Sequence, residues 1–325
     1  MVKNIVTRQY RILVDHRDIY KFMLDIYEKD WRNGVPAPFL EYALSSYWMD
    51  KSYTHRNRIW MDGEKIVAFC FTENPVTDIY FSIRPGYDEL AEEMIEYADK
   101  HMPNIDNMQR FIIFKGQEAI MSAAAKAGYV QINSSIHMVY EFDKCLDYKL
   151  PEGFRFVEAG KYNIEKCVEC CWKGFNNEEE EGPWKGDSES YYHLIQAPHV
   201  TPQYPVAIEN QKGDYVCWAG MWWTPENHLA YMEPLCTVPE YRHKGLAAAA
   251  LSELYRRMKQ LGATHMTGGS NAFYEKIRYK PMITWTFWKK KSSMTDIEMW
   301  ELFCKTQDVK ELSMKLGLLV VLLIN

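Results

Sequence analysis

The sequence predicts an α/β (α+β) fold built from two mixed-sheet domains in tandem. The chain has 325 residues, more than a typical single domain, and 47% of them are hydrophobic, enough for two sizeable cores. Each half shows strands in antiparallel succession followed by a strand–helix–strand unit. The second half also repeats landmarks of the first half, which indicates an internal duplication.

Two pairs of segments carry the duplication. Residues 83–102 resemble residues 237–258, because both place a Pro-x-Tyr turn between a strand-like run and an amphipathic helix. Residues 123–131 resemble residues 273–281 in the same way. The offset is 154 residues in the first pair and 150 residues in the second pair. A near-constant offset over two separate landmarks is the pattern that a tandem duplication leaves.

The limits of the domains follow from composition. A polar stretch with Pro and Gly, 147–154, separates the two halves. We therefore expect domains at 1–150 and 151–290, with a C-terminal extension at 291–325 outside the repeat. The extension ends in an apolar segment, 316–325, that is too short to span a bilayer. We expect this segment to dock on the protein, and a weak contact with a membrane surface is the alternative.

Periodicity places the elements of each half. In the first half we expect a strand near 8–14, helices through 16–50, strands at 58–63, 65–73 and 78–84, a helix at 88–102, a strand at 110–115, a helix at 117–127 and a strand at 134–142. In the second half we expect a strand at 154–158, helices within 161–196, strands at 204–210, 215–223 and 228–238, a helix at 246–260, a strand at 265–269, a helix at 271–277 and a strand at 282–290. Pro234 interrupts the strand 228–238 and cannot donate to a ladder, so it predicts a bulge or an edge.

Composition excludes several classes of protein. A net charge of −6 and a pI near 5.9 give no overall basic field for nucleic acid. The N-terminal residues are charged throughout and contain no apolar core, so we expect no signal peptide and a cytoplasmic location. Cys167, Cys170 and Cys171 form a cluster, but no second cluster with ligand spacing exists. We therefore expect buried thiols and no metal site.

The segment "PEYRHKGLAAAA" (239–250) is unusual for a strand-to-helix turn, because cationic side chains precede a helical turn that has almost no side chains. Backbone N–H groups of a first helical turn have no intrahelical partner and carry partial positive charge, so an open helix N-terminus stabilises an anion. The residues that we expect to contact such an anion are Arg242, His243, Lys244, Gly245, Leu246, Ala247 and Ala248.

With its preceding strand, this segment resembles the acyl-CoA pyrophosphate loop of the GNAT superfamily of N-acetyltransferases. Arg242, Gly245 and Ala247 match the family pattern Gln/Arg-x-x-Gly-x-Gly/Ala. Leu235 and Thr237 match the strand that precedes the loop in that family. The resemblance implies a tandem GNAT protein, with two GNAT-like mixed-sheet domains and acetyl-CoA as cosubstrate.

In the resembled family this strand bulges and splays from its neighbour, and the pantetheine arm bonds to the freed backbone groups. The resemblance implies that Leu235, Cys236 and Thr237 hold the pantetheine and polarise the thioester carbonyl. Cys236 also raises a covalent acyl-cysteine route, although no His accompanies it in the sequence.

The candidate catalytic residues are Tyr274 and Glu233. Tyr274 matches the family tyrosine that protonates the leaving thiolate. Glu233 lies just before the bulge and is our candidate base, directly or through water, with a structural carboxylate as the alternative. Asn271 is a candidate cofactor contact or only a helix cap. Arg278 occupies a position where the family usually has glycine, so we expect the turn there to differ.

The first half departs from the family pattern at both functional positions. Asp88, Glu89, Glu92 and Glu93 crowd the start of its helix, where they would repel a pyrophosphate. Ala124 stands at the position that corresponds to Tyr274. We therefore expect a degenerate first half and a catalytic second half.

The acceptor is indicated only in outline. The segment 175–194 is rich in Glu and contains Trp184, Tyr191 and Tyr192, so it would attract a cationic amine; a solvated charge run is the other interpretation. We expect transfer of an acetyl group from acetyl-CoA to a primary amine of a small molecule or peptide, by direct attack in a ternary complex. A non-catalytic acyl-CoA-binding or regulatory protein stays open, and so does a transferase of another acyl group. The sequence does not indicate the oligomeric state.

Overall fold

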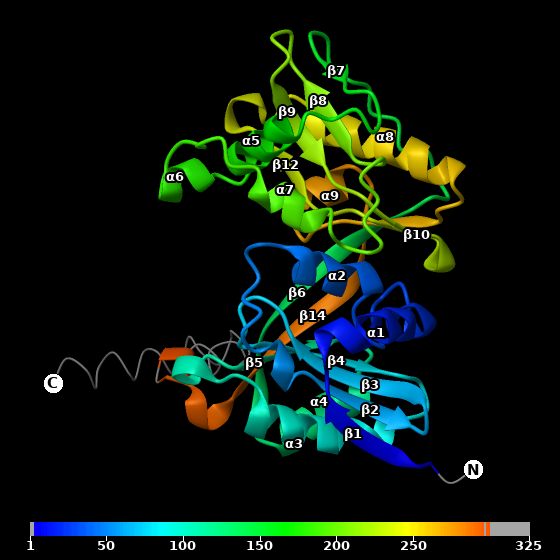
Figure 1. The fold of residues 1–325 in the computed structure, drawn as a ribbon, viewed down its shortest axis with the longest axis vertical. Coiled ribbons are helices and arrows are strands. Elements are labelled where there is room, and N and C mark those ends of the chain that lie inside the picture. The colour runs from blue at the N-terminus through cyan, green and yellow to red at the C-terminus, as the bar shows by residue number, and fades with distance from the viewer. Residues whose placement is uncertain (1–2, 296, 300–325) are drawn as a thin grey trace, which may run out of the picture.

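A computed structural model of the chain describes residues 3–295 and 297–299. It confirms the mixed α/β fold, with the first half below and most of the second half above in Figure 1. The apolar segment 316–325 lies outside the described residues, as does most of the predicted extension. No helix within the described residues is long and apolar enough to cross a membrane.

The helices and strands of the two halves follow one another in a similar order, as the duplication predicts. The first half contains β1 (Ile5–Gln9), α1 (Ile12–Ile26), α2 (Ala37–Ser45), β2 (Arg58–Asp62), β3 (Lys65–Thr72), β4 (Asp78–Ile83), α3 (Ala91–His101), β5 (Arg110–Phe114), α4 (Glu118–Lys126) and β6 (Tyr129–Glu141). The second half contains β7 (Arg155–Phe156), α5 (Ile164–Gly174), α6 (Asn177–Glu181), α7 (Glu189–Leu194), β8 (Val206–Glu209), β9 (Tyr215–Ala219), β10 (Trp222–Thr224), β11 (Leu229–Tyr231), β12 (Leu235–Thr237), α8 (Leu246–Gln260), β13 (His265–Thr267), α9 (Ala272–Lys276) and β14 (Lys280–Lys290).

The predicted strand near 8–14 is wrong. The strand ends at Gln9, and helix α1 begins at Ile12. The carboxylate of Asp15 accepts a hydrogen bond from the backbone N–H of Arg11 (2.7 Å) and pairs with Arg8, which fixes the first turn of the helix. Leu13 was a misleading apolar signal, because it is 97% exposed.

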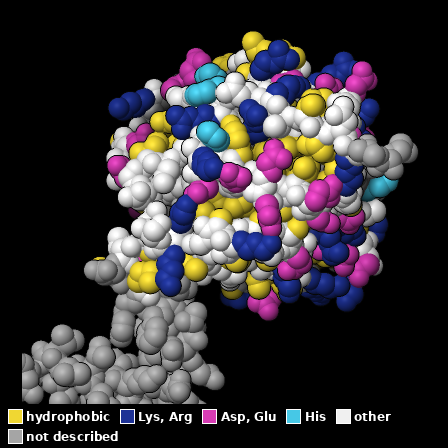
Figure 2. All heavy atoms as spheres, turned by 90° about the horizontal axis from the view of Figure 1, so that it is seen from below, with side chains coloured by type: hydrophobic (Ala, Val, Ile, Leu, Met, Phe, Trp, Pro, Cys, Tyr) yellow, Lys and Arg dark blue, Asp and Glu magenta, His cyan; other side chains and the backbone are white. Residues whose placement is uncertain are grey.

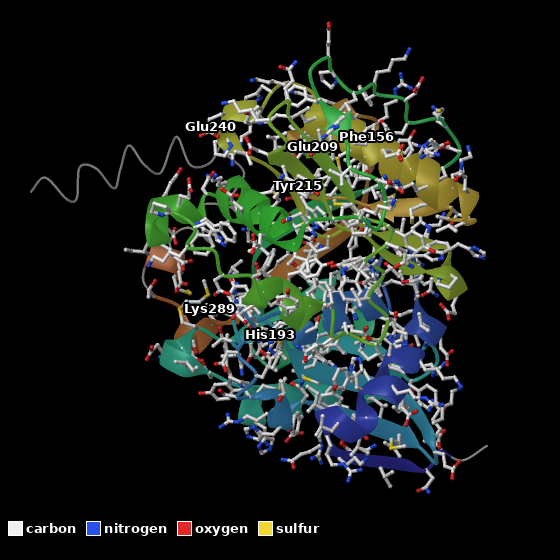
Figure 3. The ribbon with its side chains drawn as sticks, turned by 45° about the horizontal axis from the view of Figure 1, so that its top comes forward. Phe156, His193, Glu209, Tyr215, Glu240 and Lys289 are labelled. Carbon is white, nitrogen blue, oxygen red and sulfur yellow. The ribbon has the colours of Figure 1, made fainter. Side chains whose placement is uncertain are left out.

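The two halves exchange their last strands. Ten strands form one sheet in the order β1-β2-β3-β4-β5-β14-β6-β13-β11-β10, so β14 of the second half pairs with β5 of the first half. In return, β6 of the first half pairs with β13 of the second half. These two long strands cross between the halves (Figure 1), and Lys289 near the end of β14 lies among first-half elements (Figure 3).

A separate sheet of four strands, in the order β12-β9-β8-β7, belongs entirely to the second half. Helix α8 packs on one face, where Leu251 and Leu254 contact Val206 and Ile208 within one core cluster. Helix α5 packs on the other face beside Trp218. Figure 3 shows Glu209 and Tyr215 in this upper part of the molecule. The chain passes from one sheet to the other between β11 and β12, so the segments predicted to be functional lie where the two sheets meet.

One hydrophobic core joins the two halves. Trp285 of β14 packs with Trp31, Phe39 and Phe114 of the first half. On the opposite face of the large sheet, α3 and α4 cover a second core of the first half. At the first-half end of the molecule, acidic and basic side chains are interspersed over the surface (Figure 2).

Candidate active site

The strand that precedes the helix turn changes sheets, which confirms the irregularity predicted at Pro234. Strand β11 pairs in parallel with β13, whereas β12 pairs antiparallel with β9 in the other sheet. Gly220 lies at the crossing, where a Cβ atom would be 2.1 Å from the carbonyl oxygen of Glu233. Within the described residues, β12 has a partner strand on one edge only.

The register shows which backbone groups face that open edge. Gly220 N–H donates to the Pro234 carbonyl (2.7 Å), and Val238 N–H donates to the Val216 carbonyl (3.0 Å). In an antiparallel pair the bonded residues alternate along the strand, so the backbone groups of Leu235 and Thr237 face away from β9. These are the two residues from which the sequence predicts backbone contacts to pantetheine.

Cys236 lies between Leu235 and Thr237, and its backbone groups face β9. Its side chain is buried against α5, where its Sγ lies 3.9 Å from the Sγ of Cys171 and a Cβ at Gly174 would lie 2.8 Å from it. Burial raises the pKa of Cys167 to about 12, so this neighbouring thiol is a packed, protonated group. Within the described residues the cysteines form no disulfide, and no group of His, Cys, Asp or Glu side chains could hold a metal ion.

The turn after β12 presents an open helix N-terminus. Gly245 has the left-handed φ of 83° and directly precedes α8, which has no acidic residue in its first turn. His243 and Lys244 are exposed, Ala247 is half-buried, and Leu246 and Ala248 point into the core. The structure therefore brings the predicted loop and helix start together next to the open edge of β12.

Arg242 has a different position from the one that its charge suggests. Its guanidinium donates to the carbonyl of Gly174 (2.9 Å), to the side chain of Asn176 (2.6 Å) and to the carbonyl of Thr237 (3.1 Å). Arg242 thus ties the loop to the end of α5 and to β12.

Tyr274 lies beside the glycines that follow β13. Cβ atoms at Gly268 and Gly269 would lie 2.7 and 2.8 Å from its ring, so both glycines are needed for this close approach. The phenol is buried, and burial followed by the negative charge of Glu233 raises its pKa above the ordinary value. A phenol with a raised pKa stays protonated at neutral pH and can donate its proton.

The other residues near Tyr274 have structural positions. The side chain of Asn271 accepts a hydrogen bond from the N–H of Phe273 (3.1 Å) and caps α9, and Asn271 itself is exposed. Arg278 has φ of 73°, the left-handed conformation that glycine favours. The expectation of a different turn is therefore wrong, because Arg278 adopts the conformation that Gly128 has at the corresponding position of the first half.

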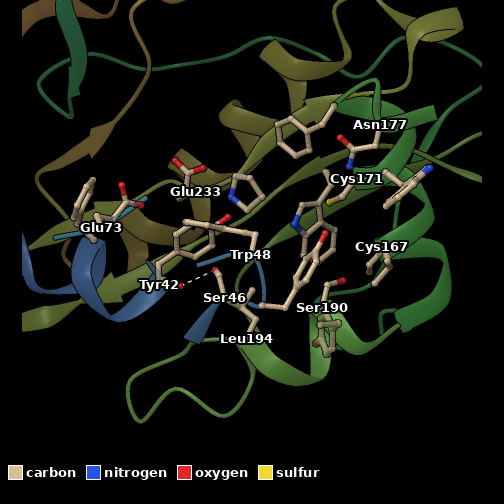
Figure 4. Close-up of a pocket in the computed structure, with 18 of the residues that line it drawn as sticks. Tyr42, Ser46, Trp48, Glu73, Cys167, Cys171, Asn177, Ser190, Leu194 and Glu233 are labelled. Carbon is tan, nitrogen blue, oxygen red and sulfur yellow. Dashed lines mark hydrogen bonds between the residues drawn. The ribbon is translucent and has the colours of Figure 1, made fainter. Parts of the chain in front are cut away.

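A cavity of about 630 Å³ opens between the two halves, next to the break between β11 and β12. Figure 4 shows Glu233 on one side of it, with Tyr42, Trp48 and Glu73 of the first half and Cys171 and Ser190 of the second half around it. Tyr274 does not line this cavity.

Two glutamates in the cavity wall have raised pKa values. Burial, and then the negative charge of Glu73, raise the pKa of Glu233 to about 7. Burial is also the largest effect on Glu73, whose pKa rises to about 7. Within the described residues, Glu233 has no hydrogen-bond donor and no ion pair. A carboxylate with a pKa near neutral can accept a proton at physiological pH.

The glutamate-rich segment 175–194 lines part of this cavity, mostly with residues other than its acidic ones. Of its acidic residues only Glu181 lines the wall, and of its aromatic residues Phe175 and Tyr191 do so. Trp184 instead donates from its ring nitrogen to the carbonyl of Asp187 (3.0 Å). Sequence reasoning missed Tyr42, Trp48 and Glu73, because they belong to the half without the loop motif and no local pattern marks them.

Strand β4 of the first half corresponds to β12 of the second half, but the edge of β4 is closed. Phe81 and Ile83 of β4 correspond to Leu235 and Thr237 by the offset of 154 residues. The N–H of Ile83 donates to the Asn33 carbonyl (2.8 Å), and the Phe81 carbonyl accepts from the side chain of Gln117 (2.9 Å). In the first half the chain itself therefore bonds to the two groups whose equivalents in β12, the Leu235 carbonyl and the Thr237 N–H, face the open edge.

The start of helix α3 is blocked as well. Lys3 bonds to the carbonyl of Gly86 and to the carboxylate of Glu89, and Glu93 accepts a hydrogen bond from the ring nitrogen of Trp60 (2.8 Å). Ile79 and Ala124 correspond to Glu233 and Tyr274, and both are fully buried.

Comparison with known proteins agrees with this geometry. Residues 170–278 match the Acetyltransferase (GNAT) family. No match was found among curated protein sequences. The fold is similar to that of a GCN5-related N-acetyltransferase from Sphaerobacter thermophilus, with a TM-score of 0.56 and 12% identity over 88% of this chain and 95% of that chain.

Two further structures have the same fold. A tandem GNAT protein from the clavulanic acid biosynthesis pathway matches with a TM-score of 0.55 and 12% identity, over 90% of this chain and 100% of that chain. A GNAT-family acetyltransferase from Colwellia psychrerythraea matches with a TM-score of 0.56 and 10% identity, over 88% of this chain and 100% of that chain. The similarity extends over both halves, so the chain has the tandem GNAT fold.

Proposed function

We propose that this chain, a tandem GNAT protein with its family motif in the second half, transfers an acetyl group from acetyl-CoA to the primary amine of a small molecule or peptide. The observation that carries the proposal is the open edge of β12, which leads directly into a helix N-terminus free of acidic side chains. In this proposal residues 151–290 form the transferase unit, and β6 of residues 1–150 completes its sheet.

The cosubstrate binds along the strand and the turn. The pyrophosphate lies against the backbone N–H groups of residues 243–248, where the helix dipole and the exposed Lys244 stabilise its charge. The pantetheine arm pairs with the outward Leu235 carbonyl and Thr237 N–H, while the Thr237 carbonyl accepts a hydrogen bond from Arg242. Arg242 holds the loop in this shape from behind.

Glu233 prepares the nucleophile. The amine enters as an ammonium and loses one proton to Glu233, directly or through water, before its nitrogen attacks the acetyl carbon. The new C–N bond forms, the nitrogen loses its second proton and the C–S bond breaks. One proton goes to the leaving sulfur, so the reaction releases one proton overall.

Tyr274 supplies the proton for the leaving thiolate. Its raised pKa keeps the phenol protonated at neutral pH, so its proton is available to the thiolate as the C–S bond breaks. After transfer, solvent returns the proton to the phenolate.

The test measures release of the CoA thiol and the mass of the acetylated product with a panel of primary amines. Tyr274→Phe should lower kcat by about 100-fold while the Kd for acetyl-CoA stays unchanged, because only the general acid is lost. Phe273→Leu, on the same short helix, is the matched control and should keep kcat within about threefold. Binding of acetyl-CoA without turnover of any amine would overturn the proposal in favour of a non-catalytic acyl-CoA-binding protein.

A further inference from the structure

The charged side chains that line the cavity between the halves are all acidic. Twenty of the residues that the structure describes line it, and three of them are glutamates: Glu73, Glu181 and Glu233. None of the twenty is Lys, Arg or His. A carboxylate or phosphate on the acceptor would therefore find no cationic partner and would face like charges, which is costly away from water.

The rest of the wall is aromatic. Nine of the twenty residues are Phe, Tyr or Trp: Phe39, Tyr42, Tyr47, Trp48, Trp172, Phe175, Tyr191, Trp218 and Tyr231. They come from both halves and surround the cavity (Figure 4). The rings of Tyr42 and Trp48 lie 5.9 Å apart, and Tyr42 also meets Trp222 edge-on at 6.0 Å, so this part of the wall is packed in place. Such a wall favours a flat apolar body and, through its ring faces, a cation.

The two deeper glutamates come from different halves and lack cationic partners. Glu73 bonds to the N–H of Asn74 and to the hydroxyl of Tyr80, and the nearby Arg110 pairs with Asp78 instead. Glu233 has no donor within the described residues. Both carboxylates line the same cavity, so one ammonium held there would be a cationic partner for both.

We propose that the acceptor is a primary ammonium carried on an aromatic body without a carboxylate, held between Glu233 of the second half and Glu73 of the first half. This inference rests on the proposed acetyl transfer and names its substrate class. Glu73 is a specificity-determining residue here: it positions the ammonium, and Glu233 receives the proton. The first half thus contributes a binding group to a site whose cofactor loop lies in the second half.

The experiment compares amines that differ by one carboxylate, using the full chain and saturating acetyl-CoA. Tyramine is compared with tyrosine, and tryptamine with tryptophan. We expect kcat/KM to be about 100-fold higher for the amine of each pair, since each amino acid would bury an unpaired charge. Putrescine tests the aromatic body, and we expect a kcat/KM about tenfold below that of tyramine.

The outcomes separate this inference from the function on which it rests. Equal or faster acetylation of tyrosine or putrescine would overturn the inference and leave the transferase proposal standing. Acetylation of no amine, with acetyl-CoA bound, would overturn both.

A variant tests the role of the first half. Glu73→Gln should raise KM for tyramine about tenfold and leave KM for acetyl-CoA unchanged, because the amide keeps the shape but loses the charge. Glu180→Gln, an exposed glutamate of α6 outside the cavity wall, is the matched control and should change neither value. Equal KM values for tyramine in the wild type and Glu73→Gln would contradict the role of Glu73.

Discussion

Strands β4 and β12 occupy equivalent places in the two halves, yet one is closed and the other is open. In β4 the backbone groups of Phe81 and Ile83 bond to Gln117 and Asn33 of the same chain. In β12 the equivalent groups, the Leu235 carbonyl and the Thr237 N–H, face an edge without a partner strand in the described structure, and Arg242 bonds only to the Thr237 carbonyl. The comparison teaches that a duplicated fold loses a ligand site when its own chain satisfies the groups that the ligand would bind.

The same contrast extends to the helix starts and to the side chains. Helix α3 begins with Glu92 and Glu93, whereas α8 begins with Leu246 and alanines. The first half nevertheless contributes to the second half, because its strand β6 pairs with β13 and its residues form one wall of the cavity. Each prediction below changes a residue at which the two halves differ and states the expected effect on binding, activity or stability.

The largest effect should come from giving α8 the acidic start of α3. Ala247→Glu places a carboxylate where we propose the pyrophosphate, so the Kd for acetyl-CoA should rise by about 100-fold or more. Ala247→Gln has nearly the same size without the charge and should weaken binding by about tenfold or less. Isothermal titration of both variants measures the difference, and equal losses would show that size rather than charge matters.

The next contrast is Glu233 against the buried Ile79 of the first half. A base must be ionised to accept a proton, and burial raises the pKa of Glu233 to about 7. Below that pH, kcat/KM should fall about tenfold per pH unit. The acceptor ammonium titrates in the same direction, so the measurement is the ratio of wild-type kcat/KM to that of Glu233→Gln. The ratio should be constant above pH 7 and fall below it; a ratio independent of pH would contradict the role of base.

A third prediction concerns the residue that closes the first half. Gln117 is buried, donates to the Phe81 carbonyl and accepts from the N–H of Phe114 (2.9 Å). Gln117→Leu leaves the Phe81 carbonyl and the Phe114 N–H without their hydrogen-bond partner, so it should lower the free energy of unfolding by about 2–4 kcal/mol. The exposed Glu118→Gln is the control and should change it by less than about 0.5 kcal/mol. Denaturant unfolding checks both, and an equal effect of the two variants would contradict this account of the closed edge.

The smallest effects on stability should come from the corresponding turns that follow α4 and α9 in the two halves. Arg278 and Gly128 have φ of 73° and 84° at corresponding positions. Arg278→Gly should raise the free energy of unfolding by about 1 kcal/mol, and Gly128→Ala should lower it by about the same amount. No atom lies within 4 Å of a Cβ at Gly128, so the second variant tests backbone conformation alone. Shifts of the same sign in both variants would contradict the argument.

Much of the fold followed from local patterns. The predicted helix 246–260 matches α8 to the residue, because Gly245 marks its start and the apolar spacing marks its buried face. The break at Pro234 was predicted because proline cannot donate to a ladder. Leu235 and Thr237 were predicted as backbone contacts from the resemblance to the GNAT family, and the register of β12 shows that their backbone groups face away from β9.

The strand exchange could not be predicted. Strands β6 and β14 have the same pattern, and β5 and β13 offer equivalent edges, so nothing local specifies which strand pairs with which edge. The cavity wall has the same difficulty, since Glu73 and Trp48 reach it only through the packing of the two halves. The acidic run in 175–194 agrees with the second of its two interpretations, a solvated charge run, because most of its glutamates are exposed on α6.

The most direct test of the contrast between the halves is the stoichiometry of acetyl-CoA binding to the full chain by isothermal titration. One open edge and one closed edge predict one site per chain. Two sites would mean that the contacts of Asn33 and Gln117 do not close the first half. No binding at millimolar acetyl-CoA would contradict the proposed role of "PEYRHKGLAAAA", and the transferase proposal would fall with it.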